Sequence, residues 1–158
     1  MFFRRSPRVL IRTLDASDSQ SCASIHSACF AHSWPASEIE AMATSSNNSA
    51  LAAVDDGSGD LLGFVISRIV LDEAEILTIA VASGCRRRGV AAMLLEMHLS
   101  ELAMERVRRL FLEVEEGNVG ARALYKKFGF VEKGRREGYY RKPDGSRTSA
   151  LIMQKAVI

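Results

Sequence analysis

Short apolar segments separated by polar, turn-forming residues recur along the chain, and this pattern predicts strands. Residues 9–14 alternate apolar and polar positions, as a half-buried strand does. Residues 50–54 and 61–70 flank a stretch of Asp, Gly and Ser and therefore predict a hairpin. Further strands are predicted over residues 75–81, 110–114 and 150–155, and from residues 130–132 onward.

Helical periodicity is clearest over residues 90–104. Val90, Met93, Leu94 and Met97 recur there at helical spacing, so we expect them to be core residues rather than a methionine-lined ligand site. Three leucines widen this apolar face: Leu95, Leu99 and Leu102. Other helices are predicted from a cap at residues 15–18 to about residue 30, over residues 37–44, and over residues 118–128, and residues 45–49 have the composition of a loop.

The order of these elements predicts the fold class. A strand, two helices, three strands, a helix, a strand, a helix and further strands fit a mixed, mostly antiparallel central sheet with helices on both faces, a three-layer α/β/α arrangement. The 158 residues suggest one domain over positions 1–158, without repeats or linkers.

Composition excludes several classes of protein. A net charge of +2 is too small to indicate a nucleic-acid-binding protein, so no DNA partner is expected. Residues 132–147 carry six Lys or Arg against three acids, which fits either an anion-facing surface or, as we favour, a solvated charged face. The three cysteines and three histidines lack metal-ligand spacing, so no metal is expected. No signal peptide or membrane-length segment is apparent, so we expect a cytoplasmic protein without membrane contact.

The turn before the helix at residues 90–104 is the strongest candidate for a ligand site. Arg86, Arg87 and Arg88 precede Gly89, which allows close backbone approach because it has no Cβ. N–H groups at a helix start lack intrahelical partners and carry the positive end of the helix dipole. The segment therefore predicts a site for the phosphates of an anionic cofactor; the alternative is an exposed basic turn.

The segment Arg86–Ala91 also fits the pattern [Q/R]-x-x-G-x-[G/A], and in this respect the chain resembles the GNAT N-acetyltransferase superfamily. Within it the chain is similar to the RimI branch, the protein N-terminal-alanine acetyltransferases. The segments that carry this similarity are residues 72–81, Leu112-Glu113-Val114, Asn118 with Ala123-Leu124-Tyr125 and Gly129-Phe130, and Arg135-Arg136 with Tyr139-Tyr140 and Asp144-Gly145.

The similarity covers about residues 34–153, and residues 1–8 have no counterpart in it and are a candidate disordered segment. The chain departs from the family at residues 115–118, where Glu-Glu-Gly-Asn stands in place of Arg-x-Ser-Asn. An acid thus replaces a base beside the expected active site, which bears on acceptor preference more than on catalysis.

The resemblance implies acetyl-CoA as co-substrate. Backbone groups of residues 86–89, called the arginine turn below, would hold the pyrophosphate. The end of the preceding strand would pair with the pantetheine arm, although that segment also fits an ordinary buried strand. The implied cofactor-binding residues are Ile79, Ala80, Val81, Arg86, Arg87, Arg88, Gly89, Val90, Ala91, Ala92 and Asn118.

The resemblance also implies two catalytic residues. Glu113 would be the general base that takes a proton from the acceptor ammonium; the alternative is a Glu on the solvated face, since Glu115 shares its alternation. Tyr125 would protonate the departing thiolate; the alternative is an aromatic core residue packed with Phe128 and Phe130.

An acceptor slot is implied between the segment around Trp34 and the Tyr139-Tyr140 pair, although packing at a strand edge fits the tyrosines equally. Glu75 could meet the cationic end of the acceptor or belong to a solvated face.

Three functions follow from these observations. The first is acetyl transfer, by direct attack in a ternary complex, to a protein N-terminal α-amine, with a ribosomal protein beginning with Ala as the acceptor named in the family. The second is acetylation of a lysine, polyamine or other small amine, motivated by the Glu115-Glu116 pair. The third is a non-catalytic module that senses acetyl-CoA or binds RNA. A monomer or weak dimer is expected.

Overall fold

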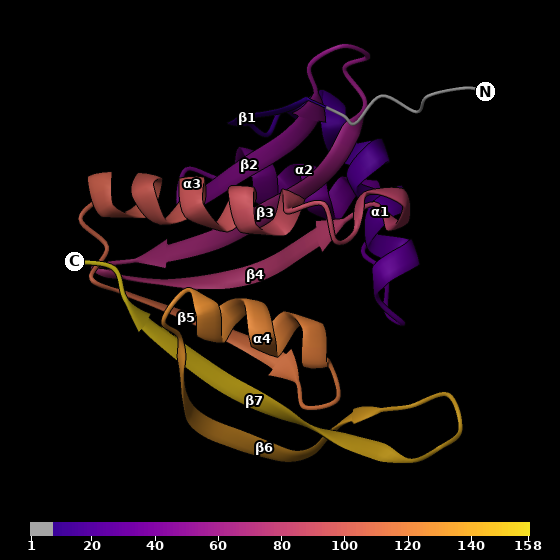
Figure 1. Ribbon diagram of the computed structural model, residues 1–158, viewed down its shortest axis with the longest axis vertical. Helices are drawn as coiled ribbons and strands as arrows, with labels where there is room; N and C mark the ends of the chain where they lie inside the picture. The colour runs from indigo at the N-terminus through magenta and orange to yellow at the C-terminus, as the bar shows by residue number, and fades with distance from the viewer. Residues whose placement is uncertain (1–7) are drawn as a thin grey trace. The chain divides into compact units, whose positions relative to one another are not determined.

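The computed structural model describes residues 8–158 (Figure 1). Strands in this range form a sheet with the order β1-β2-β3-β4-β5-β7-β6. The pairs β1–β2, β2–β3, β5–β7 and β6–β7 are antiparallel, and β4–β5 is parallel. The elements are β1 Val9–Thr13, a 3-10 turn Ala16–Asp18, α1 Ser19–Cys29, α2 Ala36–Thr44, β2 Asn48–Asp55, β3 Leu61–Val70, β4 Glu73–Val81, a 3-10 turn Ser83–Cys85, α3 Val90–Met104, β5 Arg109–Glu115, α4 Val119–Lys127, β6 Val131–Arg141 and β7 Arg147–Ala156.

The predicted mixed, mostly antiparallel sheet is confirmed, and the predicted helix over residues 90–104 is confirmed as α3. The loop prediction for residues 45–49 is wrong at its end, because Asn48 and Ser49 already belong to β2 and pair with Arg68 and Ser67. Polar residues form the strand there because the antiparallel partner satisfies their backbone groups.

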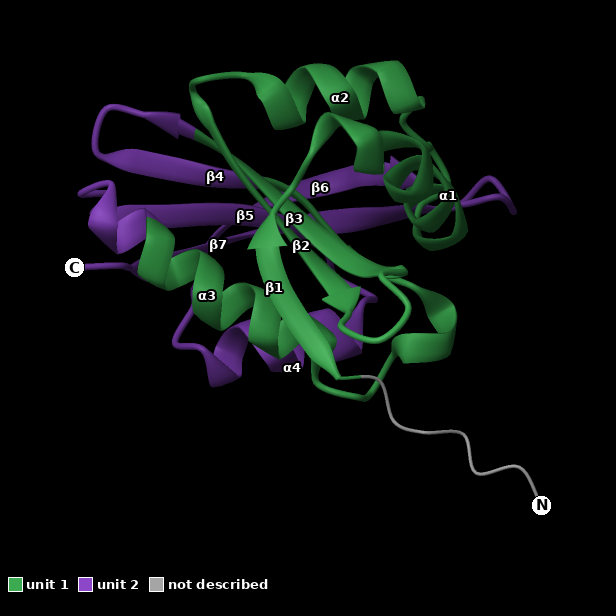
Figure 2. Cartoon of the chain, turned by 90° about the horizontal axis from the view of Figure 1, so that it is seen from above, with its two compact units in different colours: residues 1–68, 77–101 green, residues 69–76, 102–158 purple. Residues whose placement is uncertain are grey.

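The chain divides into two compact units, coloured separately in Figure 2. Unit 1 comprises residues up to 68 and residues 77–101, and unit 2 comprises residues 69–76 and 102–158. One domain over residues 1–158 stays a prediction. The prediction of disorder over residues 1–8 lies outside the described residues for positions 1–7, whereas the carbonyl of Arg8 accepts a hydrogen bond from the Asp56 N–H at 2.8 Å.

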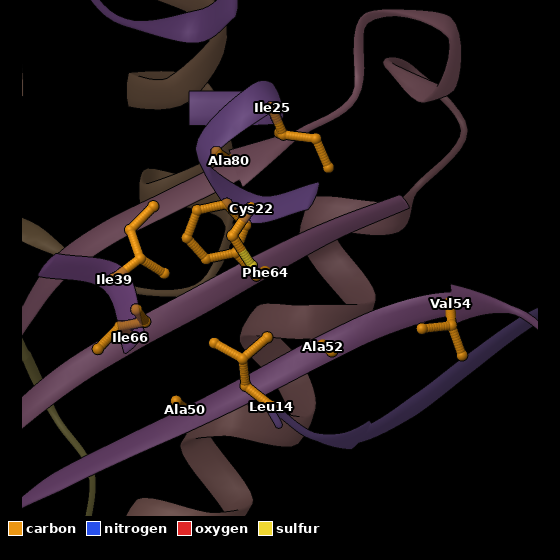
Figure 3. Packing of buried hydrophobic residues seen from close by; sticks show 10 residues of the cluster. All are labelled: Leu14, Cys22, Ile25, Ile39, Ala50, Ala52, Val54, Phe64, Ile66 and Ala80. Atoms are coloured by element: carbon orange, nitrogen blue, oxygen red, sulfur yellow. The ribbon is translucent and has the colours of Figure 1, made fainter. Parts of the chain in front are cut away.

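Unit 1 has helices on both faces of its strands. In Figure 3, Cys22 and Ile25 of α1 and Ile39 of α2 pack against Phe64 and Ile66 of β3. The opposite face carries α3, as Figure 2 shows. Both faces of β2 are covered, so its residues 50–54 are all buried regardless of their alternation.

The expectation that Met93 and Met97 belong to the core is wrong, because they are 39% and 45% exposed. The buried stripe of α3 is turned away from them and consists of Val90, Leu94, Leu95, His98 and Leu102. The spacing of apolar residues predicts a wider buried face than the one that α3 has in the structure. The position of β3 decides the outcome, since the buried Ser67 hydroxyl lies 2.6 Å from His98 Nε2 and holds that face of α3 against the strand.

Unit 2 contains α4 alongside β5 and β7, with β6 at the edge of the sheet (Figure 1). Its buried residues alternate along the strands and include Leu110, Leu112, Val114, Leu151 and Met153. Tyr125 of α4 and Phe130 complete this core, with ring centroids 5.6 Å apart. Because alternate side chains of a strand point to opposite faces, Glu113 and Glu115 lie on the face opposite to Leu112 and Val114.

Candidate active site

The arginine turn of unit 1 links β4 to α3. The side chains of Arg86, Arg87 and Arg88 are exposed, and Val90 at the helix start is buried. Arg87 and Gly89 have positive φ angles of 63° and 78°, and a Cβ added at Gly89 would meet no atom within 4 Å. The Gly89 carbonyl accepts the first helical hydrogen bond, from the N–H of Met93 at 3.0 Å.

This local geometry suits an anion. Arg87 and Gly89 have positive φ angles, and Arg88 between them does not. This alternation turns successive backbone N–H groups toward one side, as in anion-binding nests. The N–H groups of Val90, Ala91 and Ala92 lie in the first turn of α3, where no intrahelical carbonyl is available to them. The cationic side chains and the helix dipole add positive potential at the same place.

Cys29 connects this turn to β4. Its thiol donates to the Val81 carbonyl at 3.5 Å and accepts from Arg86 Nη2 at 3.3 Å. The contact brings together two of the predicted cofactor-binding residues, and sequence reasoning missed it. No sequence signal links Cys29 to residues more than 50 positions away.

The last residues of β4 have a mixed environment. Ala80 is buried against the core of unit 1, whereas Ile79 and Val81 are half-buried. The pairing of β4 with β5 comprises Glu73 to Glu75, so residues 79–81 lie beyond it along the strand. Gly63 of β3 allows close approach here, because a Cβ added to it would lie 2.8 Å from the Ala80 carbonyl oxygen.

Trp34 of unit 1 is half-buried and stacks on His26, with ring centroids 4.6 Å apart. Its backbone N–H donates to His26 Nδ1 at 3.2 Å. Burial lowers the pKa of His26, which keeps the ring neutral and able to accept this hydrogen bond. The pair fixes the segment between α1 and α2.

Glu113 lies on β5 in unit 2, and its side chain is 23% exposed. Its carboxylate Oε1 lies 3.2 Å from Nη2 of Arg136 on β6. β7 lies between the strands that carry these two residues. Glu113 of β5 pairs with Ile152 of β7, and Ile152 pairs with Gly134 of β6, which lies two residues before Arg136. Gly134 places no side chain in that row, and a guanidinium from the next row can reach the carboxylate.

Tyr139 and Tyr140 lie close to this ion pair. Their rings form an edge-to-face pair with centroids 5.2 Å apart, and the Arg136 guanidinium lies 5.2 Å from the Tyr139 ring centroid. Burial raises the pKa of the Tyr140 phenol, and the nearby Glu113 carboxylate raises it further. The structure therefore brings Glu113 and both tyrosines together, with Arg136 as a further member.

A bulge in β6 produces this arrangement. Arg136 pairs with Ala150 and Tyr140 pairs with Thr148, so three residues of β6 lie opposite Ser149 alone. Ser149 Oγ accepts from the Gly138 N–H at 3.3 Å and donates to Glu137 Oε2 at 3.2 Å. Gly138 adopts a φ of 58° that favours glycine. Bulges re-aim side chains beside functional sites, and a glycine within a predicted strand is the sequence signal for one.

Tyr125 and Asn118 both belong to α4. Tyr125 is 6% exposed, and burial raises the pKa of its phenol to about 12, so the hydroxyl keeps its proton throughout the physiological range. Asn118 caps the helix, and its side-chain oxygen accepts from the Ala121 N–H at 3.2 Å. Tyr125 packs against Phe130, with ring centroids 5.6 Å apart, as the alternative of an aromatic core residue describes; its catalytic role stays a prediction.

The remaining acids of unit 2 have different surroundings. Glu75 is half-buried on β4 and pairs in register with Phe111 of β5. Glu116 is bound by Arg135 through two hydrogen bonds of 2.7 and 2.8 Å, and Arg135 Nε also lies 2.7 Å from Glu137. Two of the six cations counted in residues 132–147 are thus ion-paired with acids of β5, β6 and the turn after β5.

Among residues 8–158, no cluster of three His, Cys, Asp or Glu side chains is placed to hold a metal ion. Across the same range, no helix is long and apolar enough to cross a membrane.

Comparison with known proteins decides the family, because residues 19–130 match the acetyltransferase (GNAT) family. This chain belongs to the GNAT family. It is therefore an acyltransferase that uses acetyl-CoA as its acetyl donor, and the predicted resemblance is confirmed.

Relatives of this GNAT chain place it near one branch. It is 38% identical over 123 residues to the [ribosomal protein bS18]-alanine N-acetyltransferase of Escherichia coli strain K12, covering 78% of this chain and 82% of that one. The crystal structure of the ribosomal-protein-S18-alanine N-acetyltransferase from Escherichia coli superposes with a TM-score of 0.88 at 31% identity, covering 95% and 94% of the two chains. Ard1 from Thermoplasma volcanium superposes with a TM-score of 0.84 at 27% identity, covering 95% and 98%.

Proposed function

We propose that this GNAT enzyme transfers the acetyl group of acetyl-CoA to the N-terminal α-amine of a protein, with a ribosomal protein beginning with alanine as its acceptor. The observation that carries the proposal is the 38% identity to a bS18-alanine N-acetyltransferase over 78% of the chain. Glu113 and Tyr125, the two catalytic residues that the family resemblance implies, are consistent with it. The enzyme would act in the cytoplasm, where ribosomal proteins are made.

The donor site proposed here lies in unit 1. Backbone N–H groups of the arginine turn and of Val90 to Ala92 bind the pyrophosphate, because they combine unpaired donors with positive potential. The backbone of Ile79 to Val81 pairs with the pantetheine arm. Asn118, in unit 2, stays a cofactor-binding residue implied by the family resemblance alone. The role of Cys29 is to hold Val81 and Arg86 together.

Glu113 is the proposed general base. An α-ammonium has a pKa of about 7.7–8.0, against about 10.4 for a lysine, so it loses its proton more easily than a lysine does, and a carboxylate in contact with it can receive that proton as the amine attacks. The amine nitrogen then attacks the thioester carbonyl and the new C–N bond forms. As the tetrahedral intermediate collapses, the C–S bond breaks and the nitrogen loses its second proton, so that the proton balance closes on CoA leaving as its thiol. The products are the acetylated terminus and CoA.

Tyr125 is the proposed proton donor to sulfur. Its phenol, with a pKa of about 12, is a weaker acid than a thiol of about 8.5, so complete transfer to a finished thiolate is unfavourable by roughly 5 kcal/mol. The phenol can nevertheless donate a hydrogen bond to sulfur while negative charge develops on it. This hydrogen bond thus stabilises the transition state and not the finished thiolate.

Glu75, Tyr139 and Tyr140 of unit 2 are the proposed acceptor-binding residues, and Trp34 of unit 1 stays a separate prediction for the same role. Flat aromatic rings and hydroxyl groups suit the extended backbone of a peptide. The acetylation of polyamines is less favoured, because Glu116, one of the two acids that motivated it, is held by both terminal nitrogens of Arg135.

The test measures CoA thiol release with two short peptides. One begins Ala-Arg with a free terminus, and the other is blocked at its terminus and carries a lysine. We expect activity with the free terminus alone. Activity with the blocked peptide would transfer the assignment to lysine acetylation, and no activity with either peptide would contradict the proposal.

The matched variants are Glu113→Gln and Glu115→Gln, which change two acids of the same strand and face. Glu113→Gln should lower kcat by about 10²-fold or more while the Kd for acetyl-CoA stays unchanged. Glu115→Gln should retain turnover. Equal turnover in the wild type and Glu113→Gln would reject Glu113 as the base.

A further inference from the structure

The ion pair between Glu113 and Arg136 raises a question about the acceptor. The proposed base must receive the cationic end of the acceptor, yet a cation of the enzyme already lies 3.2 Å from its Oε1. Oε1 is the oxygen in contact with Arg136, so an ammonium that binds at this oxygen meets the charge of the guanidinium at close range. The acceptor and Arg136 therefore compete for this side of the carboxylate.

We propose that Arg136 occupies the position of the acceptor's ammonium group, and that a cationic N-terminus binds by displacing Arg136 from Glu113. This inference rests on the proposed function, because it takes Glu113 as the group that meets the acceptor amine. It makes Arg136 a specificity-determining residue. An acceptor without a positive terminus cannot replace the charge that Glu113 would lose.

The contact between Glu113 and Arg136 is weak enough for the acceptor ammonium to replace Arg136. The ion pair joins Nη2 to Oε1 at 3.2 Å, and the side chain of Arg136 is 52% exposed. An ion pair with one partner this open to solvent is partly screened and contributes little to stability, so an arriving ammonium can compete with it. The neighbouring Arg135 differs, because it binds Glu116 through two parallel hydrogen bonds and Glu137 through a third contact.

Arg136 has a second partner after release. Its guanidinium already lies 5.2 Å from the ring centroid of Tyr139, a distance that suits a cation–π contact. Tyr139 lies in the bulge of β6 and is 54% exposed, so the guanidinium can stay on its ring after the contact with the carboxylate is broken. The exchange then needs a change of side-chain rotamer and no change in the strand.

The test measures the binding of a short peptide beginning Ala-Arg, with and without N-terminal acetylation, to the CoA-saturated enzyme by calorimetry. In the variant Arg136→Gln, the free-terminus peptide should bind about two- to five-fold more tightly, because no resident cation has to be displaced. The acetylated peptide should bind as it does to the wild type. Arg136→Lys should restore the wild-type affinities, since an ammonium can again pair with Glu113.

The control is Arg135→Gln, which removes the same charge from the adjacent position. It separates exchange at Glu113 from a general change in electrostatic potential. Equal tightening in both variants, tightening for both peptides, or weaker binding in Arg136→Gln would overturn the inference. A wild type that neither binds nor acetylates the free-terminus peptide would remove the proposed function and this inference together, whereas an active wild type with unaltered Arg136→Gln affinities would remove the inference alone.

Discussion

The buried His98 makes the stability of unit 1 depend on pH. Its ring is fully buried, Nε2 is hydrogen-bonded to the Ser67 hydroxyl at 2.6 Å, and Nδ1 has no hydrogen-bond partner in the described part of the chain. Burial lowers the pKa of His98 from 6.5 to about 4. A protonated ring would add a charge and an unsatisfied N–H to the interior, so the folded state resists protonation.

The sign and size of the effect follow from proton linkage. Above pH 6.5 the ring is neutral in both states and contributes nothing to the pH dependence. Between pH 6.5 and pH 4 the unfolded chain binds more protons, so the free energy of unfolding falls as the pH falls. At about 1.4 kcal/mol per pKa unit, the loss reaches about 2.5 kcal/mol at pH 4.5. This is a large share of a typical stability of roughly 5–15 kcal/mol.

The double variant Ser67→Ala/His98→Leu removes the ionisable ring together with the hydroxyl that would otherwise lose its partner. Urea unfolding at pH 7 and pH 4.5 gives the loss of stability for each protein. The loss in the wild type should exceed that in the double variant by about 2.5 kcal/mol. The exposed His32 provides the control variant His32→Gln, which should behave as the wild type. Equal losses in the wild type and the double variant would refute the reasoning.

Three further predictions concern the sheet and α4. Gly63→Ala should weaken acetyl-CoA binding and lower the free energy of unfolding by about 1–3 kcal/mol, because the new Cβ would lie 2.8 Å from the Ala80 carbonyl oxygen. Calorimetry measures the binding, and thermal unfolding measures the stability. The control is Gly84→Ala, whose Cβ would meet no atom within 4 Å. Tyr125→Phe should lower kcat by about 100-fold at unchanged KM for acetyl-CoA, and unchanged kcat would exclude the proton-donor role. Gly120→Ala should raise the free energy of unfolding by about 0.5–1 kcal/mol in urea titrations, because this exposed helical position has open space for a methyl group; a loss of stability would contradict this.

Local signals in the sequence were sufficient for most elements of the fold. The predicted bounds of the helix over residues 90–104 agree with α3, because a glycine precedes it and the apolar period is regular. The hairpin of β2 and β3 follows from two apolar runs around a polar turn. The face of α3 could not be predicted, because Met93 and His98 both fit a helical stripe. The contact with Ser67 is what places His98 on the buried side of α3.

The candidate site divides in the same way. The arginine turn and Glu113 stand in short motifs that a sequence displays directly. The pairing of Glu113 with Arg136 depends on registers across three strands and on a bulge in β6, and neither is encoded in neighbouring residues. Arg135 and Arg136 are adjacent and chemically identical in sequence, yet they bind different acids, since successive residues of a strand point to opposite faces.

The bulge in β6 also has a consequence for evolution within the family. Residues 137–139 form a short arc held at its base by Ser149, and regular pairing resumes on either side at Arg136 and Tyr140. Glu137 and Tyr139 of this arc can be exchanged without changing the register of β7, whereas Gly138 is constrained by its φ of 58°. Acceptor preference can therefore diverge at this point of the strand through a few substitutions, while the acetyl-CoA site and the stability of the sheet are inherited unchanged.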